Sequence, residues 1–296
     1  MSNTNKNQFT HLKIHTQYSI CEGAVKIIDL KDFCKKNKIH AIGLSDTKNL
    51  CGALEFAENI SKVGTQPIIG SQINFKFKDQ IGILTLIANN FEGYKSIIGL
   101  SSKSYLENKT TDEPHCLFQE LLNIKSGTTV LSGSFEGLIG NLFAKNLLTE
   151  IDEVLKLIKD VFKDKFYLEI QRHNDVGEKL FEEFLLKKSN DLAIPLIATQ
   201  EVFYLDKSMH EAHDALICIG EKTYVSEKKR KKYSDEHYLK SSEQIIEIFS
   251  DLPEALENNF NFPFKCNYKP KPSLPILPNI RVSKDIDVDQ ELINLA

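Results

Sequence analysis

Two hydrophobic periodicities alternate along most of this chain, and together they predict alternating strands and helices. Short apolar runs, or strict alternation of apolar and polar residues, are typical of strands that bury one or both faces. Two such runs lie so close together that we expect them to pair as a hairpin around residues 78–80. The predicted strands are residues 11–15, 41–45, 67–77, 81–88, 128–131, 166–171 and 195–199.

Between these strands, apolar residues recur at helical spacing. The clearest case is Ile151, Val154, Leu155, Ile158 and Phe162, which form one stripe of an amphipathic helix. The strand and helix patterns follow one another through short connections, which indicates an α/β domain with a mainly parallel sheet. The predicted helices are residues 25–36, 53–63, 91–100, 117–123, 151–162, 178–190, 210–219 and 242–249.

We expect this sheet to close, or nearly close, into a distorted (β/α) barrel. At least six strand–helix units follow one another, which favours a barrel over an open sheet. In such barrels the chemistry lies at the carboxyl ends of the strands. The polar residues at those ends are His15, Asp46, Gln72, Ser132, Gly133, Ser134, His173, Gln200 and Glu201.

The character of the sequence changes at Pro263. Five of the nine prolines lie between residues 263 and 278, which disfavours a helix or a central strand and predicts an extended linker. An acidic helix is expected to begin near residue 285. The predicted organisation is a disordered tail (1–8), a barrel domain (9–262), and a linker with the start of a further domain (263–296).

Composition narrows the classes of function. Hydrophobic residues make up 41% of the 296 residues and charged residues 26%, which suits a packed core and speaks against disorder. The net charge of −4 gives no overall attraction to nucleic acid, so a DNA contact would need a local basic patch. The six cysteines include no C-x-x-C pair, which speaks against a zinc ribbon. Because no signal peptide or membrane span is evident, we expect a cytoplasmic protein.

Three residues at the strand ends, His15, Asp46 and His173, are of types that bind metals. Taken singly, each is better explained by structure than by metal binding. A lone histidine is more often held by a structural hydrogen bond, and an aspartate after a strand often caps a helix. The longer motifs around these residues indicate whether they belong to a metal site.

The first three motifs are HLKIHTQYS (residues 11–19), IGLSDTKNLCG (42–52) and PIIGSQ (67–72). Two later ones are YLEIQRH (167–173) and IATQEVFYL (197–205). In sequence and order they are similar to the motifs of the PHP (polymerase and histidinol phosphatase) family.

Three further segments are AHDALICIG (212–220), YLKS (238–241) and PEALEN (253–258). They resemble the amino-terminal PHP domain found in bacterial DNA polymerase III alpha subunits, truncated before the polymerase core. The similarity extends from about Phe9 to Ile280. The resemblance implies a distorted seven-stranded α/β barrel of the PHP type.

The resemblance also implies a trinuclear metal centre with nine ligand positions. Three positions keep the family's ligand, His15, Asp46 and His173, and Glu201 is a conservative exchange for aspartate. The other five have lost the ligand: Lys13, Thr47, Gln72, Ser134 and Phe203.

These exchanges predict a degenerate site. Three divalent ions need several carboxylates and imidazoles to balance their charge. The ammonium of Lys13 would repel metal and is expected to neutralise Asp46 or Glu201 instead. We therefore expect no catalytic residue and no bound metal in this chain. Any residual metal would be held by His15, Asp46, His173 and Glu201. The Mg²⁺ ions of polymerisation belong to a polymerase core, whose motifs this chain lacks.

Two functions from different classes follow from the resemblance. The first is a non-catalytic structural barrel within a DNA polymerase III alpha chain, whose parent polypeptide catalyses DNA-directed DNA synthesis in chromosomal replication and binds DNA. Its expected partners are the rest of the polymerase III holoenzyme and a separate proofreading exonuclease subunit. The exonuclease is expected to dock near Phe9, Tyr18 and Ile20, although burial in the barrel core explains Ile20 at least as well. The alternative is a metal-dependent PHP phosphoesterase, either a phosphatase or a 3′–5′ exonuclease.

One basic run is a candidate DNA contact through the phosphate backbone. It consists of Lys228, Lys229, Arg230, Lys231 and Lys232. The flanking acids Glu227, Asp235 and Glu236 dilute its field, which favours a solvated loop over a binding site.

Overall fold

The computed structural model describes residues 8–109, 111–124, 126–276 and 287–296. Its centre is a curled sheet with the strand order β8-β7-β6-β4-β3-β2-β1-β9, and β5 pairs with β3 beside this path. Each predicted strand is present. The strands are β1 (Lys13–Ile14), β2 (Ala41–Thr47), β3 (Gln66–Phe77), β4 (Gln80–Ala88), β5 (Cys116–Leu117), β6 (Thr128–Leu131), β7 (Phe166–Ile170), β8 (Leu196–Ala198) and β9 (Glu201–Val202).

Two short strands on one stretch of chain close the sheet into a barrel. β8 lies parallel to β7, and β9 lies parallel to β1, with Lys13 opposite Glu201. Only Thr199 and Gln200 separate β8 from β9, so the two act as one interrupted strand that joins both edges of the sheet. When β8 and β9 are counted together and β5 is set aside as an addition, the barrel has the seven strands that the pattern predicts. The α/β class and the PHP-type barrel are confirmed.

The predicted hairpin is formed by β3 and β4. The two strands pair antiparallel from Gly70 opposite Ile87 to Phe77 opposite Gln80. In the turn, Lys78 adopts a φ of 51°, in the left-handed region. β4 is also antiparallel to β6, so it runs against both of its neighbours and distorts the otherwise parallel barrel.

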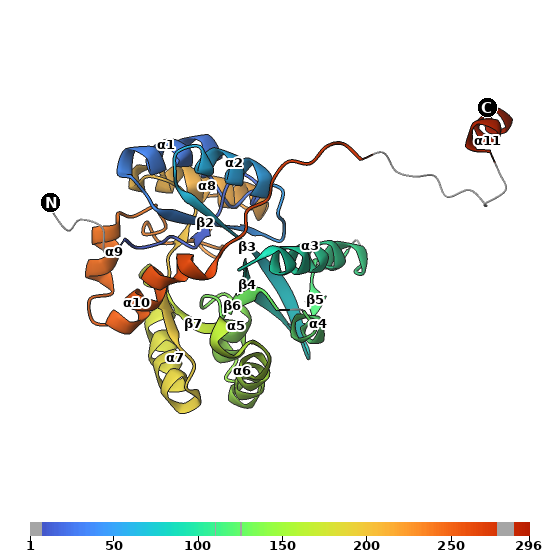
Figure 1. Cartoon of the computed structure of the whole chain (residues 1–296). Helices are drawn as coiled ribbons and strands as arrows, with labels where there is room; N and C mark the ends of the chain where they lie inside the picture. Colours follow the sequence, from blue (N-terminus) through green and yellow to red (C-terminus); the bar gives the residue numbers. More distant parts are fainter. Residues whose placement is uncertain (1–7, 110, 125, 277–286) are drawn as a thin grey trace.

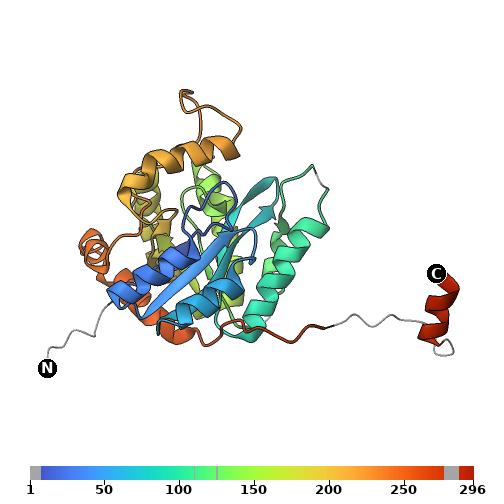
Figure 2. The ribbon, with the colours of Figure 1, turned by 90° about the horizontal axis from the view of Figure 1, so that it is seen from above.

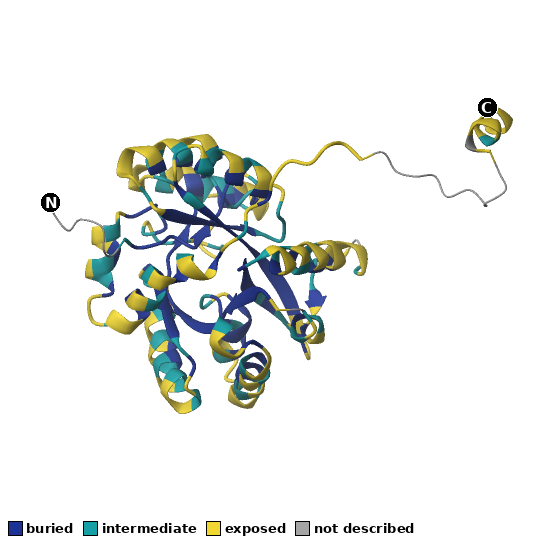
Figure 3. Ribbon diagram, viewed as in Figure 1, coloured by how far each residue is buried: buried dark blue, intermediate teal, exposed yellow. Residues whose placement is uncertain are grey.

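Within the described residues, ten helices lie outside the barrel, with buried inner faces and exposed outer faces (Figures 1 and 3). They are α1 (Ile27–Asn37), α2 (Ala53–Ser61), α3 (Phe91–Leu106), α4 (Phe118–Leu122), α5 (Leu138–Ala144), α6 (Leu148–Phe162), α7 (Glu178–Leu192), α8 (His210–Gly220), α9 (Ser242–Ile248) and α10 (Pro253–Asn261). A further helix, α11 (Val288–Leu295), has no buried residue among those described. The sequence did not predict α5 or α10. None of the described helices is long and apolar enough to cross a membrane.

The barrel interior is divided into an apolar layer and a polar layer. In β7, Phe166, Leu168 and Ile170 face the helices, so Tyr167 and Glu169 point inward. Tyr167 belongs to the apolar layer, whereas Glu169 reaches the polar layer at the carboxyl ends of the strands. The apolar layer consists of Leu12, Ala41, Ile68, Ile87, Leu131, Tyr167, Ile197, Phe262 and Cys266.

The packed chain continues beyond residue 262, where the linker was predicted to begin. The side chain of Gln66 donates hydrogen bonds to the carbonyls of Pro263 (3.0 Å) and Cys266 (2.8 Å). The backbone N–H of Asn267 donates to the carbonyl of Asn89 (2.8 Å). These bonds, together with the burial of Cys266, hold residues 263–267 under the barrel.

Both predicted ends of the chain fall partly outside the described residues. Of the predicted tail, residues 1–7 lie outside them, and the side chain of Gln8 accepts a hydrogen bond from the backbone of His40 (2.7 Å). The predicted acidic helix near residue 285 corresponds to α11, although residues 285 and 286 themselves lie outside the described residues.

Asn259 should be critical for the fold, because its buried amide joins α10 to β8 and to the segment that precedes β1. It accepts from the N–H of Thr10 (2.8 Å) and donates to the carbonyls of Thr10 (2.9 Å) and Ala198 (3.0 Å). Asn259→Ala should lower the free energy of unfolding by about 2–4 kcal/mol, since it leaves three buried groups without a partner. Urea unfolding measures this loss. The neighbouring Asn258→Ala removes one hydrogen bond, to Leu196 (2.8 Å), and should cost about 1 kcal/mol; equal losses would contradict the assignment.

Candidate functional site

The polar layer is centred on a buried lysine. Lys13 extends from β1 into the barrel with 1% of its side chain exposed. Its Nζ lies 3.1 Å from Oε1 of Glu169 on β7 and 3.6 Å from Oε1 of Glu201 on β9. Burial alone would lower the pKa of Lys13, but the two carboxylates outweigh it and raise the pKa above its ordinary value. The ammonium is therefore charged and joins three strands.

Glu201 brings four other predicted site residues together around its own atoms. Oε1 lies 2.9 Å from Nε2 of His15 and accepts a hydrogen bond from the side chain of Gln72 (2.5 Å). Its backbone N–H donates to Nε2 of His173 (3.1 Å). Burial alone would raise the pKa of Glu201, but Lys13 and these hydrogen bonds hold it well below its usual range. Glu201 is thus an ionised hub of the polar layer.

Asp46 has a different set of partners. Its carboxylate accepts hydrogen bonds from the backbone N–H of Thr16 (2.7 Å), the hydroxyl of Thr16 and the hydroxyl of Ser19 (2.8 Å). Burial raises the pKa of Asp46, and these bonds only partly offset that effect. The expectation that Lys13 pairs with Asp46 or Glu201 is therefore met by Glu201, and the second partner is Glu169 instead of Asp46.

Three other positions where the resemblance implies a metal ligand, Thr47, Phe203 and Ser134, lie near this network. Thr47 places its hydroxyl 3.2 Å from Nδ1 of His15 and donates to Glu22. Phe203 places an apolar ring 4.6 Å from the ring of His15, so this side of the site offers no ligand atom. Ser134 lies apart from the network, in the wall of an adjacent cavity.

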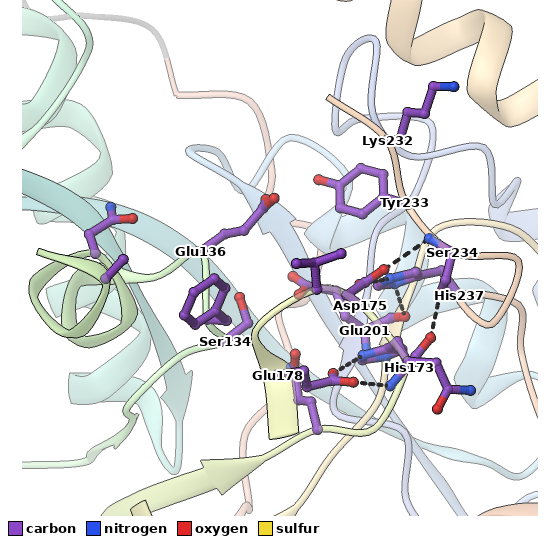
Figure 4. A pocket seen from close by; sticks show the side chains of 16 residues that line it. Ser134, Glu136, His173, Asp175, Glu178, Glu201, Lys232, Tyr233, Ser234 and His237 are labelled. Carbon is purple, nitrogen blue, oxygen red and sulfur yellow. Dashed lines mark hydrogen bonds and ion pairs between the residues drawn. The ribbon is translucent and has the colours of Figure 1, made fainter. Parts of the chain in front are cut away.

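That cavity has a volume of about 440 Å³ and opens beside His173 and Glu201 (Figure 4). Nδ1 of His173 lies 3.1 Å from Glu178, and Nε2 of His237 lies 2.8 Å from Asp175. Burial lowers the pKa of His173 well below its ordinary value and raises that of Glu178 to about 7. His173 is therefore a neutral imidazole.

One group at this cavity has the composition of a metal site. His173, Asp175 and His237 place ligand atoms within 4.8 Å of one another. The two imidazole rings are stacked, with centroids 4.0 Å apart and planes 4° from parallel. An imidazole nitrogen binds a metal in the plane of its ring, so two parallel stacked rings cannot share one ion in this arrangement. The group is better described as a hydrogen-bonded stack.

The basic run divides between inward and outward residues. Both Nη atoms of Arg230 bond to the carboxylate of Asp214 at 2.6 Å, and 2% of the Arg230 side chain is exposed. In this conformation the guanidinium of Arg230 is therefore engaged by Asp214, and a phosphate contact by the basic run stays a prediction. Lys231 pairs with Glu136 (3.2 Å). Lys228, Lys229 and Lys232 are exposed.

Sequence reasoning missed Glu169, Asp175 and His237 as site residues. Glu169 had a usable signal, because strand alternation puts it on the same face as Tyr167 and Gln171. His237 directly precedes the segment YLKS (238–241), but nothing in that pattern marked it as a site residue, and it reaches His173 only through the fold.

Comparisons with known proteins identify the family of the chain. The PHP domain family matches residues 11–173. The chain belongs to the PHP domain family. It is 36% identical over 284 residues to the DNA polymerase III subunit alpha of Rickettsia felis, an alignment that covers 94% of this chain and 23% of that protein. It is 32% identical over 309 residues to the subunit of the same name from Caulobacter vibrioides (100% and 27% covered).

The resemblance to the PHP domain of polymerase III alpha subunits is thereby confirmed, and the chain spans about a quarter of the length of these relatives. Among solved structures, an amidohydrolase from Chromobacterium violaceum superposes with a TM-score of 0.46 at 8% identity, covering 66% of this chain and 87% of that chain. A two-domain Bacteroides vulgatus protein containing a predicted PHP-like metal-dependent phosphoesterase gives a TM-score of 0.43 at 14% identity, with coverages of 83% and 66%.

Removing the charge of Lys13 should destabilise the barrel strongly. Lys13→Met leaves the carboxylates of Glu169 and Glu201 buried without their cation, and we expect the free energy of unfolding to fall by about 3–5 kcal/mol in urea titrations. Adding Glu169→Gln to this variant should recover part of the loss. The control is Lys188→Met, which breaks a surface ion pair with Asp152 and should cost ~1 kcal/mol or less. A Lys13→Met variant as stable as this control would refute the central role of Lys13.

Proposed function

We propose that this chain is a non-catalytic PHP barrel within a cytoplasmic replicative DNA polymerase of the polymerase III alpha type. The parent polypeptide would catalyse DNA-directed DNA synthesis, bind DNA and assemble into the polymerase III holoenzyme. Support comes from the family membership, the identity to polymerase subunits and, above all, the position of Lys13. At a position where the resemblance implies a metal ligand, Lys13 supplies a positive charge to Glu201, another such position, and to the neighbouring Glu169.

The charge balance of the polar layer supports the absence of a trinuclear centre. Three divalent ions carry six positive charges, which clustered carboxylates and imidazoles must offset. Here Glu169 and Glu201 already share the charge of Lys13, and Phe203 contributes no ligand atom. The residues therefore do not fit the metal centre of the family. The carboxylates that hold Mg²⁺ for polymerisation would lie in another part of the parent chain.

A metal-dependent phosphoesterase is the second candidate, and one observation favours it. The cavity beside His173 and Glu201 is large enough for a small phosphoester and is lined by imidazoles and carboxylates. Against it stand the stacked geometry of His173 and His237 and the ammonium of Lys13.

Metal content separates the two candidates. Protein purified without chelator should contain no stoichiometric Zn, Mn or Fe by elemental analysis, and it should not hydrolyse a phosphomonoester or single-stranded DNA above background. His15→Ala and Asp46→Ala serve as controls for specific binding. The phosphoesterase candidate would be favoured by near-stoichiometric metal that both variants lose, or by hydrolysis that declines in His173→Ala.

We further propose that the barrel holds a proofreading exonuclease subunit near the polymerase. A rigid barrel can bind a partner at low ordering cost, and docking raises the local concentration of the exonuclease. Of the three residues expected at the docking site, Phe9 is buried and Tyr18 is half-buried, with its hydroxyl bonded to Glu55 (2.6 Å). Ile20 is 82% exposed, contrary to the explanation that it lies in the core. The proposal therefore centres on Ile20.

A binding titration of this chain against the cognate exonuclease subunit tests this docking role. We expect a complex that Ile20→Asp weakens at least tenfold, because a charge would be buried at the contact. Leu180→Asp is the matched control, since Leu180 is 64% exposed on α7 and lies outside the proposed site. No complex at tens of micromolar would refute docking on this domain, and equal weakening by both variants would refute the site.

A further inference from the structure

Residues 224–236 cross the mouth of the barrel without forming a helix or strand, and we call this segment the strap. One backbone–backbone hydrogen bond lies within the strap, from the N–H of Glu227 to the carbonyl of Tyr224 (3.0 Å). No other bond of this kind joins these thirteen residues, all of them described, to one another or to the barrel. Figure 2 shows the loop after α8 projecting beyond the neighbouring helices. The strap is therefore held in place by bonds that involve side chains, some its own and some from the barrel, such as the side chain of Gln200, which donates to the carbonyl of Glu236 (3.1 Å).

Two ion pairs fasten the middle of the strap to different sides of the mouth, and at its carboxyl end Asp235 and Glu236 also pair with Lys207. Arg230 makes two hydrogen bonds to Asp214 on α8, both at 2.6 Å, and its guanidinium is almost fully covered. Lys231 pairs with Glu136, which lies in the connection between β6 and α5. The paired geometry of Arg230 is the stronger of the two, since it is bidentate and shielded from solvent.

The inner side of the strap covers the polar layer. The ring of Tyr233 packs 4.7 Å from that of Phe203 and 5.0 Å from that of His237. The hydroxyl of Ser234 donates to the carbonyl of His173 (2.5 Å), and its N–H donates to Asp175 (2.9 Å). As Figure 4 shows, these residues form one wall of the cavity and lie over His173.

We propose that the strap is a lid that opens as a unit over this cavity, with the Arg230–Asp214 pair as its latch. A segment with few backbone hydrogen bonds opens at much lower free energy than the strands beneath it. Opening uncovers His173 and the carboxylates around it while the barrel stays closed, because no barrel strand includes strap residues. The proposal assigns Arg230 and Lys231 an intramolecular role, whatever the catalytic state of the barrel.

Limited trypsin digestion of the full chain, followed by mass spectrometry, measures opening. Cleavage after Arg230 or Lys231 requires that side chain to leave its partner, whereas the exposed Lys228, Lys229 and Lys232 can be cut while the strap is closed and are followed as separate sites. Asp214→Asn should accelerate cleavage after Arg230 and Lys231 about tenfold or more, because it removes a bidentate charged pair. Asp152→Asn, which breaks an ion pair with Lys188 far from the strap, should leave both rates unchanged.

Two further readings separate local opening from unfolding. Cleavage after Lys187, inside α7, should stay slow in Asp214→Asn if the barrel remains folded. Diethyl pyrocarbonate should modify His173 and His237 faster in this variant than in the parent, with the exposed His40 as the internal reference. Equal cleavage after Arg230 in parent and variant would refute the latch. Faster cleavage with unchanged modification of His173 and His237 would refute the lid, as would acceleration at Lys187 to the same extent.

Discussion

The rest of the structure depends on the ion pairs that Lys13 makes with Glu169 and Glu201. The barrel closes where β9 meets β1, and each of these strands has two residues, so the ladder at this seam contributes few hydrogen bonds. Lys13 compensates, since its ammonium lies between a carboxylate on β7 and another on β9. A buried ion pair is weak evidence for net stability, but losing one partner leaves an uncompensated charge. Removing the charge of Lys13 would therefore leave two buried carboxylates unpaired and destabilise the contact between β9 and β1.

The same ammonium determines the state of the residues around it. It holds Glu201 in its ionised form, and Glu201 in turn accepts from Gln72 and contacts His15. The backbone N–H of Glu201 donates to Nε2 of His173 and so orients its ring, on which the ring of His237 stacks. Three of the exchanged positions, Lys13, Thr47 and Gln72, therefore belong to one connected network, in which Gln72 and Thr47 donate hydrogen bonds where the resemblance implies metal ligands. A fully connected network of this kind is rigid, and a rigid barrel is what a docking role needs.

Hydrophobic periodicity was enough to predict the seven barrel strands, the hairpin and most of the helices. It missed β5 and β9, which have two residues each and are too short to show a period, and it also missed α5 and α10. It also placed His15, Asp46, His173 and Glu201 at the strand ends correctly, because parallel strands bring their carboxyl ends to one edge. The partners of Lys13 could not be chosen in advance, since Asp46 and Glu201 both seemed available and the loop at Thr16 and Ser19 takes up the carboxylate of Asp46. His237 reaches the site through the strap, whose path depends on tertiary contacts.

A lysine in place of a metal ligand changes how the stability of the barrel depends on its surroundings. A bound metal stabilises a fold only as far as its free concentration exceeds its dissociation constant, so a metal-dependent barrel weakens when metal is scarce. The ammonium of Lys13 is covalently attached, and its raised pKa keeps it charged throughout the neutral range. The barrel then lacks the catalytic chemistry of a metal ion, because a lysine held between two carboxylates cannot activate water or bind a phosphate as a metal ion does. The exchange suits the non-catalytic role proposed above, which requires a stable barrel and a surface for a partner but no bound metal.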